Sequence, residues 1–115
     1  MIKILHNPRC GKSREGIAIL EEIGEPFEIV KYLDNPLNEK ELSLLIKELK
    51  CAPMDLVRQK EKIWIEQFKG KSLSDAEIIK AIAKNPILME RPIVITKNKA
   101  VIGRPPQKII KFLKK

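Results

Sequence analysis

The sequence predicts an α/β domain whose mixed four-stranded sheet is built from a β-α-β segment and a later β-β-α segment. Three observations favour this fold class. The chain of 115 residues is long enough for one core, short β-favouring runs stand near both ends, and apolar residues recur at helical spacing between them. The 43% apolar and 33% charged residues are typical of a globular protein and argue against disorder.

The first third of the chain reads as strand, loop, helix and strand. Residues 2–5 form a short β-favouring run that stops before Pro8. From Gly11 onward apolar residues recur at helical spacing until Gly24, which is expected to end the helix. A second strand is expected over residues 27–32.

The middle of the chain is expected to be a helical insertion over about residues 37–85. Apolar residues at i, i+3, i+4 and i+7 predict an amphipathic helix there: Leu42, Leu45, Ile46 and Leu49. Residues 53–85 are expected to be helical throughout. The last of these helices should open at Ser74, where the sequence to Glu77 has the pattern of a capping box.

The last third supplies two more strands and a helix. Residues 92–96 and 100–102 are strand candidates joined by a short polar connection, and residues 109–113 predict a basic amphipathic helix. A βα unit followed later by ββα is typical of a thioredoxin-like sheet. We therefore expect one thioredoxin-like domain over residues 1–115, with the helical insertion inside it.

Charge and cysteine usage narrow the class of protein. The formal net charge is +8 and uneven: residues 1–57 carry 8 basic and 10 acidic side chains, whereas residues 58–115 carry 15 and 5. The second half should therefore attract an anion. Two cysteines are too few for a secreted disulfide framework. Neither a signal peptide nor a membrane-spanning run of about 18 apolar residues is visible, so we expect a cytoplasmic protein.

The loop before the first helix carries the residues with the clearest chemistry. Cys10 is expected where free backbone N–H groups and the helix dipole converge, and such a position stabilises a thiolate. The neighbouring Arg9, Lys12 and Arg14 add positive charge. The same N–H groups can bind an anion, so a nucleophile and an oxyanion pocket coincide in one loop.

Other interpretations of this loop are weaker. A small structural cysteine at a strand end is the plain alternative for Cys10. Residues 6–13 come within one residue of a nucleotide-binding G-x-x-x-x-G-K-[ST] loop, but His6 replaces the first glycine and Pro8 removes an N–H donor. A cysteine-phosphatase loop would need an arginine where Gly16 stands.

The chain resembles the ArsC family of glutaredoxin-dependent arsenate reductases, thioredoxin-fold proteins with a helical insertion. The loop His6-Asn7-Pro8-x-Cys10-Gly11-x-Ser13-Arg14 is similar to that family's active-site loop. The resemblance extends along the chain through three further segments: Asn85-Pro86-Ile87-Leu88, Glu90-Arg91-Pro92-Ile93-Val94 and Gly103-Arg104-Pro105.

The resemblance implies a set of site residues. Cys10 corresponds to the catalytic nucleophile. Three arginines correspond to the ligands of the substrate oxyanion, namely Arg58, Arg91 and Arg104. Supporting positions are His6, Gly11, Ser13 and Pro92, and Pro92 is similar to the cis-proline that thioredoxin-like folds place opposite the active cysteine. Guanidinium groups suit this role because they bind oxyanions bidentately. No metal site is expected from one histidine and two distant cysteines.

The implied activity is the reduction of arsenate to arsenite, a role in arsenic detoxification. Cys10 would form an adduct with arsenic. Because Ser13 replaces a second loop thiol, glutathione would act as co-substrate and glutaredoxin as reductant, with no bound cofactor. We interpret Cys51 as structural, with a Cys10–Cys51 disulfide as the lesser alternative. We expect a monomer with no membrane partner.

Two other classes of function stay open. The resemblance also covers Spx-type transcription regulators, which bind RNA polymerase; those usually carry a Cys-x-x-Cys pair where this chain has Cys10 and Ser13. The other class is a thiol oxidoreductase inactive on arsenate. Direct binding to nucleic acid is not expected, because apart from the charge no recognition helix or base-reading cluster stands out. Trp64 and Phe68, four residues apart, are better explained as one packed helix face than as stacking platforms for bases.

Overall fold

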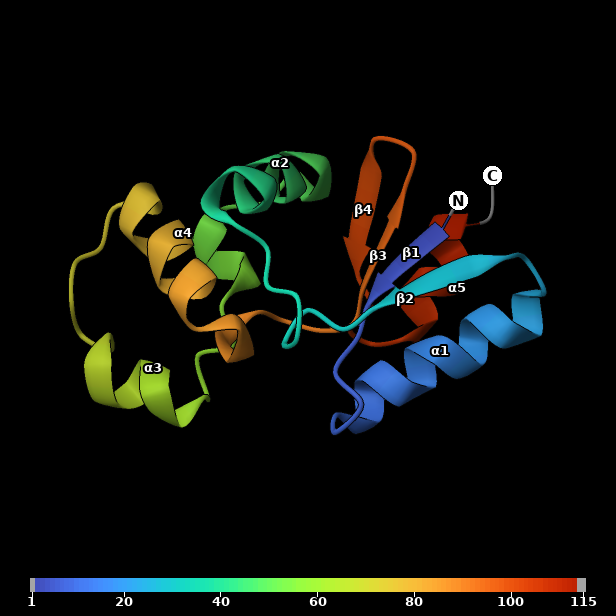
Figure 1. The fold of residues 1–115 in the computed structure, drawn as a ribbon, viewed down its shortest axis with the longest axis horizontal. Coiled ribbons are helices and arrows are strands. Elements are labelled where there is room, and N and C mark those ends of the chain that lie inside the picture. Colours follow the sequence, from blue (N-terminus) through green and yellow to red (C-terminus); the bar gives the residue numbers. More distant parts are fainter. Residues whose placement is uncertain (1, 114–115) are drawn as a thin grey trace. The chain divides into compact units, whose positions relative to one another are not determined.

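The computed structural model describes residues 2–113 of the chain (Figure 1). It separates into two compact units. One unit combines the residues up to Asn35 with those from Arg91 onward, and the other is the segment Pro36–Glu90. Within residues 2–113, every helix is too short or too polar to cross a membrane.

The first unit contains a mixed four-stranded sheet, as predicted. Its strands are β1 (Ile2–Leu5), β2 (Phe27–Val30), β3 (Ile93–Thr96) and β4 (Lys99–Ile102), in the spatial order β2-β1-β3-β4. β1 runs parallel to β2 and antiparallel to β3, and β3 is antiparallel to β4. The sequence order β-α-β followed by β-β-α is therefore confirmed.

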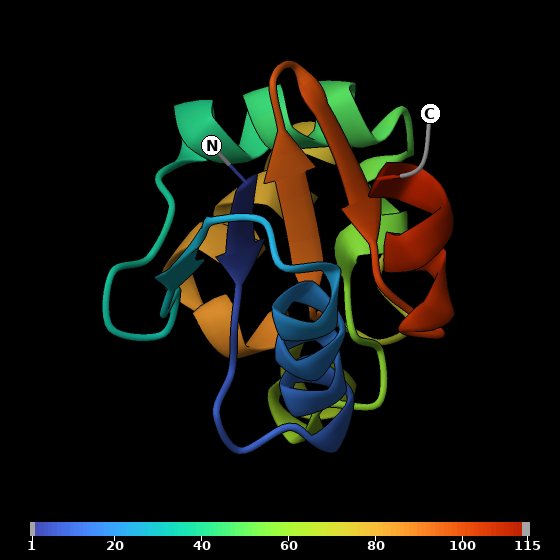
Figure 2. The ribbon, with the colours of Figure 1, turned by 90° about the vertical axis from the view of Figure 1, so that its right-hand side faces the viewer.

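Two helices, α1 (Gly11–Ile23) and α5 (Gln107–Leu113), cover the same face of this sheet (Figure 2). Their contact with the sheet is apolar: the core of this face consists of Ile4, Leu20, Val94 and Ile109. Helix α1 ends where predicted. Gly24 adopts a left-handed conformation with φ +80° and donates its N–H to the carbonyl of Leu20, a geometry that costs glycine little.

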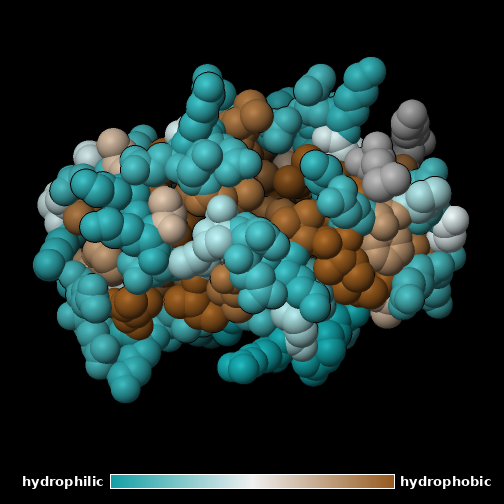
Figure 3. Space-filling model, viewed as in Figure 1, coloured by the Kyte–Doolittle hydropathy of each residue, from teal (hydrophilic) through white to brown (hydrophobic). Residues whose placement is uncertain are grey.

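The central strands β1 and β3 are the best buried parts of the sheet. Ile4, Ile93 and Val94 are fully buried, whereas Ile29 on the edge strand β2 is 44% exposed. Hydrophobic side chains accordingly reach the surface between β2 and α1 (Figure 3). β1 leads into the Cys10 loop, and β3 follows Pro92. The two segments that hold the candidate site residues are therefore attached to the best buried strands of the sheet.

The second unit is helical. It contains α2 (Glu39–Leu49), α3 (Lys62–Gln67), α4 (Asp75–Lys84) and two 3₁₀ turns, η1 (Pro53–Leu56) and η2 (Pro86–Leu88). The predicted capping box at Ser74 and Glu77 is present. Trp64 and Phe68 stack with ring centroids 5.3 Å apart, which agrees with their interpretation as a packed pair.

The prediction that residues 53–85 are helical throughout is wrong. Val57 is extended and pairs in an antiparallel bridge with Met89. On either side of this bridge, Arg58 donates its N–H to the carbonyl of Leu88, and Glu90 donates to that of Leu56. Apolar periodicity cannot reveal such a bridge, because it joins backbone groups that are far apart in the chain.

Candidate active site

Cys10 is the N-cap residue of α1. Its backbone is extended (φ −96°, ψ 122°), and its carbonyl accepts the N–H of Arg14 at 3.0 Å to begin the helix. The first N–H groups of a helix have no partner inside it. The half-buried thiol of Cys10 thus lies among donors that favour its charged form.

The surroundings of Cys10 stabilise the thiolate. Burial alone raises the pKa of Cys10, but three groups together outweigh it: the backbone N–H of Ser13, the guanidinium of Arg91 through both a hydrogen bond and its charge, and the backbone N–H of Lys12. The pKa of Cys10 is therefore lowered from its ordinary value. The sequence predicted the contribution of the helix start, and the structure adds Arg91.

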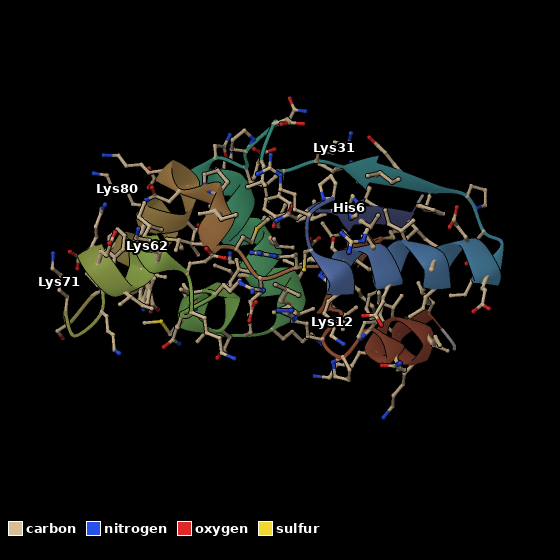
Figure 4. The ribbon with its side chains drawn as sticks, turned by 90° about the horizontal axis from the view of Figure 1, so that it is seen from below. His6, Lys12, Lys31, Lys62, Lys71 and Lys80 are labelled. Atoms are coloured by element: carbon tan, nitrogen blue, oxygen red, sulfur yellow. The ribbon has the colours of Figure 1, made fainter. Side chains whose placement is uncertain are left out.

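Ser13 ties the loop to the end of β1. Its Oγ lies 2.7 Å from His6 Nδ1 and accepts the backbone N–H of Asn7 at 3.0 Å. All three residues are buried, and Ser13 completely so. His6, Lys12 and Lys31 surround the end of β1 and the start of α1 in Figure 4. The network fixes the path by which the chain enters α1.

The surroundings of His6 favour its neutral form. Burial lowers the pKa of His6, the charge of Lys31 lowers it further, a hydrogen bond with the backbone of Ser13 opposes these effects, and the charge of Arg14 again lowers it. A neutral imidazole can accept the hydroxyl hydrogen of Ser13 at Nδ1 while that oxygen accepts the N–H of Asn7. His6 is thus a hydrogen-bonded residue at the strand end.

Arg91 and Pro92 reach the site from the start of β3. Arg91 is buried, with a relative exposure of 6%, and its guanidinium lies within hydrogen-bonding reach of the Cys10 thiol. The Arg91–Pro92 peptide bond is cis, as the resemblance implied, and Arg104–Pro105 is cis as well. The carbonyl of Pro92 accepts the N–H of Gly103 at 2.8 Å. This bond joins the two segments that carry Arg91 and Arg104.

Pro92 lies in a space left by two glycines. A Cβ built on Gly16 of α1 would lie 2.9 Å from Pro92 Cγ, and one built on Gly103 would lie 3.2 Å from the same atom and 2.9 Å from Ile109. Real Cβ atoms essentially never come within 3.0 Å of another atom, and each position has at least one contact shorter than that, so both favour glycine. From the sequence, Gly16 is only the residue that argues against a cysteine-phosphatase loop. A glycine inside a helical pattern was the available signal for close packing.

The other predicted oxyanion ligands occupy different places. Arg104 is half-buried just after β4, and its N–H donates to the carbonyl of Ile102. Arg58 belongs to the helical unit, on extended backbone after η1. Its Nε lies 3.1 Å from Glu61 Oε1, whereas its Nη1 is buried and donates no hydrogen bond to any residue from 2 to 113. Such a donor is costly unless something satisfies it.

The remaining candidates are Gly11 and Cys51. Gly11 is the first residue of α1, where a Cβ would lie in ordinary contact, 3.8 Å from Arg14 Nη2. Cys51 is free, as is Cys10. Burial, and then the negative charge of Asp55, raise the pKa of Cys51, so its thiol is the less reactive one. Residues 2–113 bring together no cluster of three or more metal-ligating side chains.

Fold and site together define a class of protein: a thioredoxin-like domain with one thiolate-stabilising cysteine at the start of its first helix. The ArsC family model matches residues 5–112, and the chain belongs to the ArsC family. It is 42% identical over 110 residues to an arsenate reductase of Neisseria meningitidis, covering 94% of each chain. It is 44% identical over 114 residues to the uncharacterized protein YfgD of Escherichia coli, covering 97% of this chain and 96% of that one.

The solved structures agree with this assignment. An arsenate reductase from Vibrio cholerae superposes with a TM-score of 0.93 at 38% sequence identity, covering 97% of each chain. An ArsC family related protein from Bacteroides fragilis, 20% identical, superposes with a TM-score of 0.85 over 96% of this chain and 97% of that one, which shows the fold alone. The predicted family and fold class are thereby confirmed.

Proposed function

We propose that this protein reduces arsenate to arsenite, with the Cys10 thiolate as nucleophile. One observation carries the proposal: a single thiol receives the backbone N–H groups of Ser13 and Lys12 together with the guanidinium of Arg91. Such a site both activates sulfur and attracts an anion. The family's curated members include proteins named arsenate reductase, which supports arsenate as the substrate.

The proposed reaction conserves atoms and electrons. The Cys10 sulfur attacks arsenic, an arsenate oxygen leaves as water, and a sulfur–arsenic bond forms. Glutathione then attacks the adduct. As arsenic(V) becomes arsenic(III), the two electrons come from the two sulfurs, which join as a mixed disulfide of Cys10 and glutathione. Per arsenate, two thiols yield one disulfide, one arsenite and one water.

The arginines would hold the charged oxygens. Arg91 suits this role because its buried guanidinium is already directed at the Cys10 thiol. Pro92 packs closely against Gly16 and Gly103, and this packing keeps the segment that carries Arg91 in place. We assign Arg104 an oxyanion-binding role from the family resemblance, and Arg58 from that resemblance and from its buried Nη1, which donates no hydrogen bond within the described residues 2–113.

Glutathione and glutaredoxin are the proposed partners, in a cytoplasmic setting. The loop offers Ser13 where a resolving cysteine could stand, so the second thiol must come from outside. Cys51 is a poor substitute because burial and Asp55 raise its pKa. We therefore assign Cys51 no part in the reaction.

The test is a coupled assay with glutathione, glutaredoxin, glutathione reductase and NADPH, in which NADPH loss is followed with and without arsenate. We expect turnover in the wild type and in Cys51→Ser, none in Cys10→Ser, and a fall in kcat/KM of about tenfold or more in Arg91→Lys. Arsenate-independent reduction of a glutathione mixed disulfide, with no arsenate-dependent rate, would instead identify a thiol oxidoreductase inactive on arsenate.

A further inference from the structure

The loop between β1 and α1 is held by hydrogen bonds of three kinds. The carbonyl of Asn7 accepts the N–H of Cys10 at 3.0 Å, and its side-chain oxygen accepts the N–H of Arg9 at 3.0 Å. Ser13 Oγ holds the N–H of Asn7. The third kind comes from the side chain of Arg14, which belongs to α1 as Ser13 does: Arg14 Nη1 donates to the carbonyl of Pro8 at 2.8 Å.

Arg14 turns back over the first turn of its own helix. Side chains on a helix point toward its N-terminus, so a residue in the first turn can reach the chain that precedes it. The guanidinium accordingly passes beside Gly11, since its Nη2 would lie 3.8 Å from a Cβ at that position. The side chain of Arg14 therefore connects Pro8, on the exposed part of the loop, to the first turn of α1.

This connection matters because the two ends of the loop have different supports. Asn7 is buried and bound to Ser13, whereas Pro8 and Arg9 are exposed. Proline has no N–H, so the carbonyl of Pro8 is the one backbone hydrogen-bonding group through which this residue can be held. A charged donor makes a stronger bond to it than a neutral one. The angle at which Cys10 enters α1 depends on where Pro8 lies.

We propose that Arg14 is a positioning residue for Cys10: its hydrogen bond to the Pro8 carbonyl holds the loop so that the Cys10 sulfur stays aligned with the N–H groups of Lys12 and Ser13. The proposal rests on the proposed function only in taking Cys10 as the nucleophile. It assigns Arg14 no contact with arsenate. Its action is geometric, which distinguishes it from the oxyanion-binding role of Arg91.

The hydrogen bond and the charge of Arg14 can be separated by two variants. Arg14→Lys keeps the charge but loses the planar donor fork, and Arg14→Gln loses both. Arg9→Gln is the matched control, because it removes one exposed positive charge from the same loop and leaves the backbone N–H that binds Asn7. The readout is the rate at which iodoacetamide alkylates Cys10 between pH 5 and 9, in a Cys51→Ser background and without arsenate.

If Arg14 positions the loop, both Arg14→Lys and Arg14→Gln shift the alkylation profile to higher pH. The rate near pH 6.5 should then fall about two- to fivefold, equally at low and high salt, as expected for one hydrogen bond. Amide hydrogen exchange at Lys12 and Ser13 should also become faster, whereas Arg9→Gln should leave both readouts near wild type. A wild-type profile in Arg14→Lys, with a salt-dependent loss only in Arg14→Gln, would show that charge alone acts and would overturn the proposal.

The test is independent of the substrate. Because alkylation needs no arsenate, an arsenate-inactive protein can still show the effect of Arg14. Conversely, full arsenate turnover together with unchanged alkylation in both Arg14 variants would retain the proposed function and reject the positioning role.

Discussion

Gly16 in the middle of α1 and Pro92 before β3 are packed so closely that a Cβ on the glycine would lie 2.9 Å from Pro92 Cγ. The same Cβ would meet Ile4 and Ile109 at 3.3 Å each. All three neighbours are buried side chains that have little room to move. The helix that Cys10 caps is thereby packed directly against the segment that carries Arg91.

Gly16→Ala should therefore destabilise the protein. Overpacking should cost more than the roughly 1 kcal/mol that alanine gains over glycine in a helix, for a net loss of about 1–2 kcal/mol. Urea unfolding measures the change. Gly11→Ala is the matched control for stability, since its Cβ would have only the 3.8 Å contact with Arg14. If Gly16→Ala left the free energy of unfolding unchanged or raised it, the close packing of Pro92 against Gly16 would be contradicted.

The two cysteines should differ in their response to pH. The pKa of Cys10 is lowered, because hydrogen bonds and the charge of Arg91 outweigh burial, while burial and Asp55 raise the pKa of Cys51. Only the thiolate is alkylated, so at pH 7 Cys10 should react first, and Cys51 should catch up as the pH rises above its own higher pKa. Mass spectrometry after brief iodoacetamide treatment reads both sites. Equal labelling at pH 7 would show that the loop does not stabilise the thiolate.

Ser13→Ala should cost stability more than it costs thiolate formation. The substitution leaves the buried N–H of Asn7 without its Ser13 acceptor and removes the partner of His6, at an expected cost of about 1–3 kcal/mol. The backbone N–H of Ser13 that faces Cys10 is retained. Thermal unfolding and the alkylation profile of Cys10 measure the two effects. Ser72→Ala, at an exposed serine, should change neither.

Ser74→Ala should weaken the helical unit. Ser74 Oγ accepts the N–H of Glu77 at 3.2 Å, and the Glu77 carboxylate accepts the N–H of Ser74 at 2.9 Å. Removing the cap from α4 should cost about 1 kcal/mol in free energy of unfolding. The measurement is chemical denaturation followed by far-ultraviolet circular dichroism. Stability equal to that of Ser72→Ala would mean that the capping box contributes nothing.

Features that depend on neighbours in the chain were predictable. The strand at residues 2–5, the helix ending at Gly24 and the capping box at Ser74 all follow from short-range rules of periodicity and capping. The position of Cys10 at a helix start belongs to this group, since it needs only the strand, loop and helix around it. The interactions that decide these features act between residues close together in the chain, so a pattern of a few residues is enough to predict them.

Features that depend on residues distant in the chain were not predictable from the sequence. The bridge between Val57 and Met89 interrupts a segment that periodicity reads as helical, because backbone pairing over a long loop leaves no local signal. The hydrogen bond of Arg14 to Pro8 is local, yet its existence depends on a rotamer that residue spacing does not specify. Family resemblance pointed to Arg91, but its approach to the Cys10 thiol was visible only in the folded chain.

The sequence by itself thus determined the order of elements, the reactive cysteine and its place at a helix start, because local propensity and capping decide these. The tertiary structure alone decided what completes the surroundings of that cysteine. Arg91 reaches the thiol, and Gly16 receives Pro92, only after β1 and β3 have paired in the sheet. Pairing in register brings together residues from opposite ends of the chain, and the close packing around Pro92 then fixes where they lie.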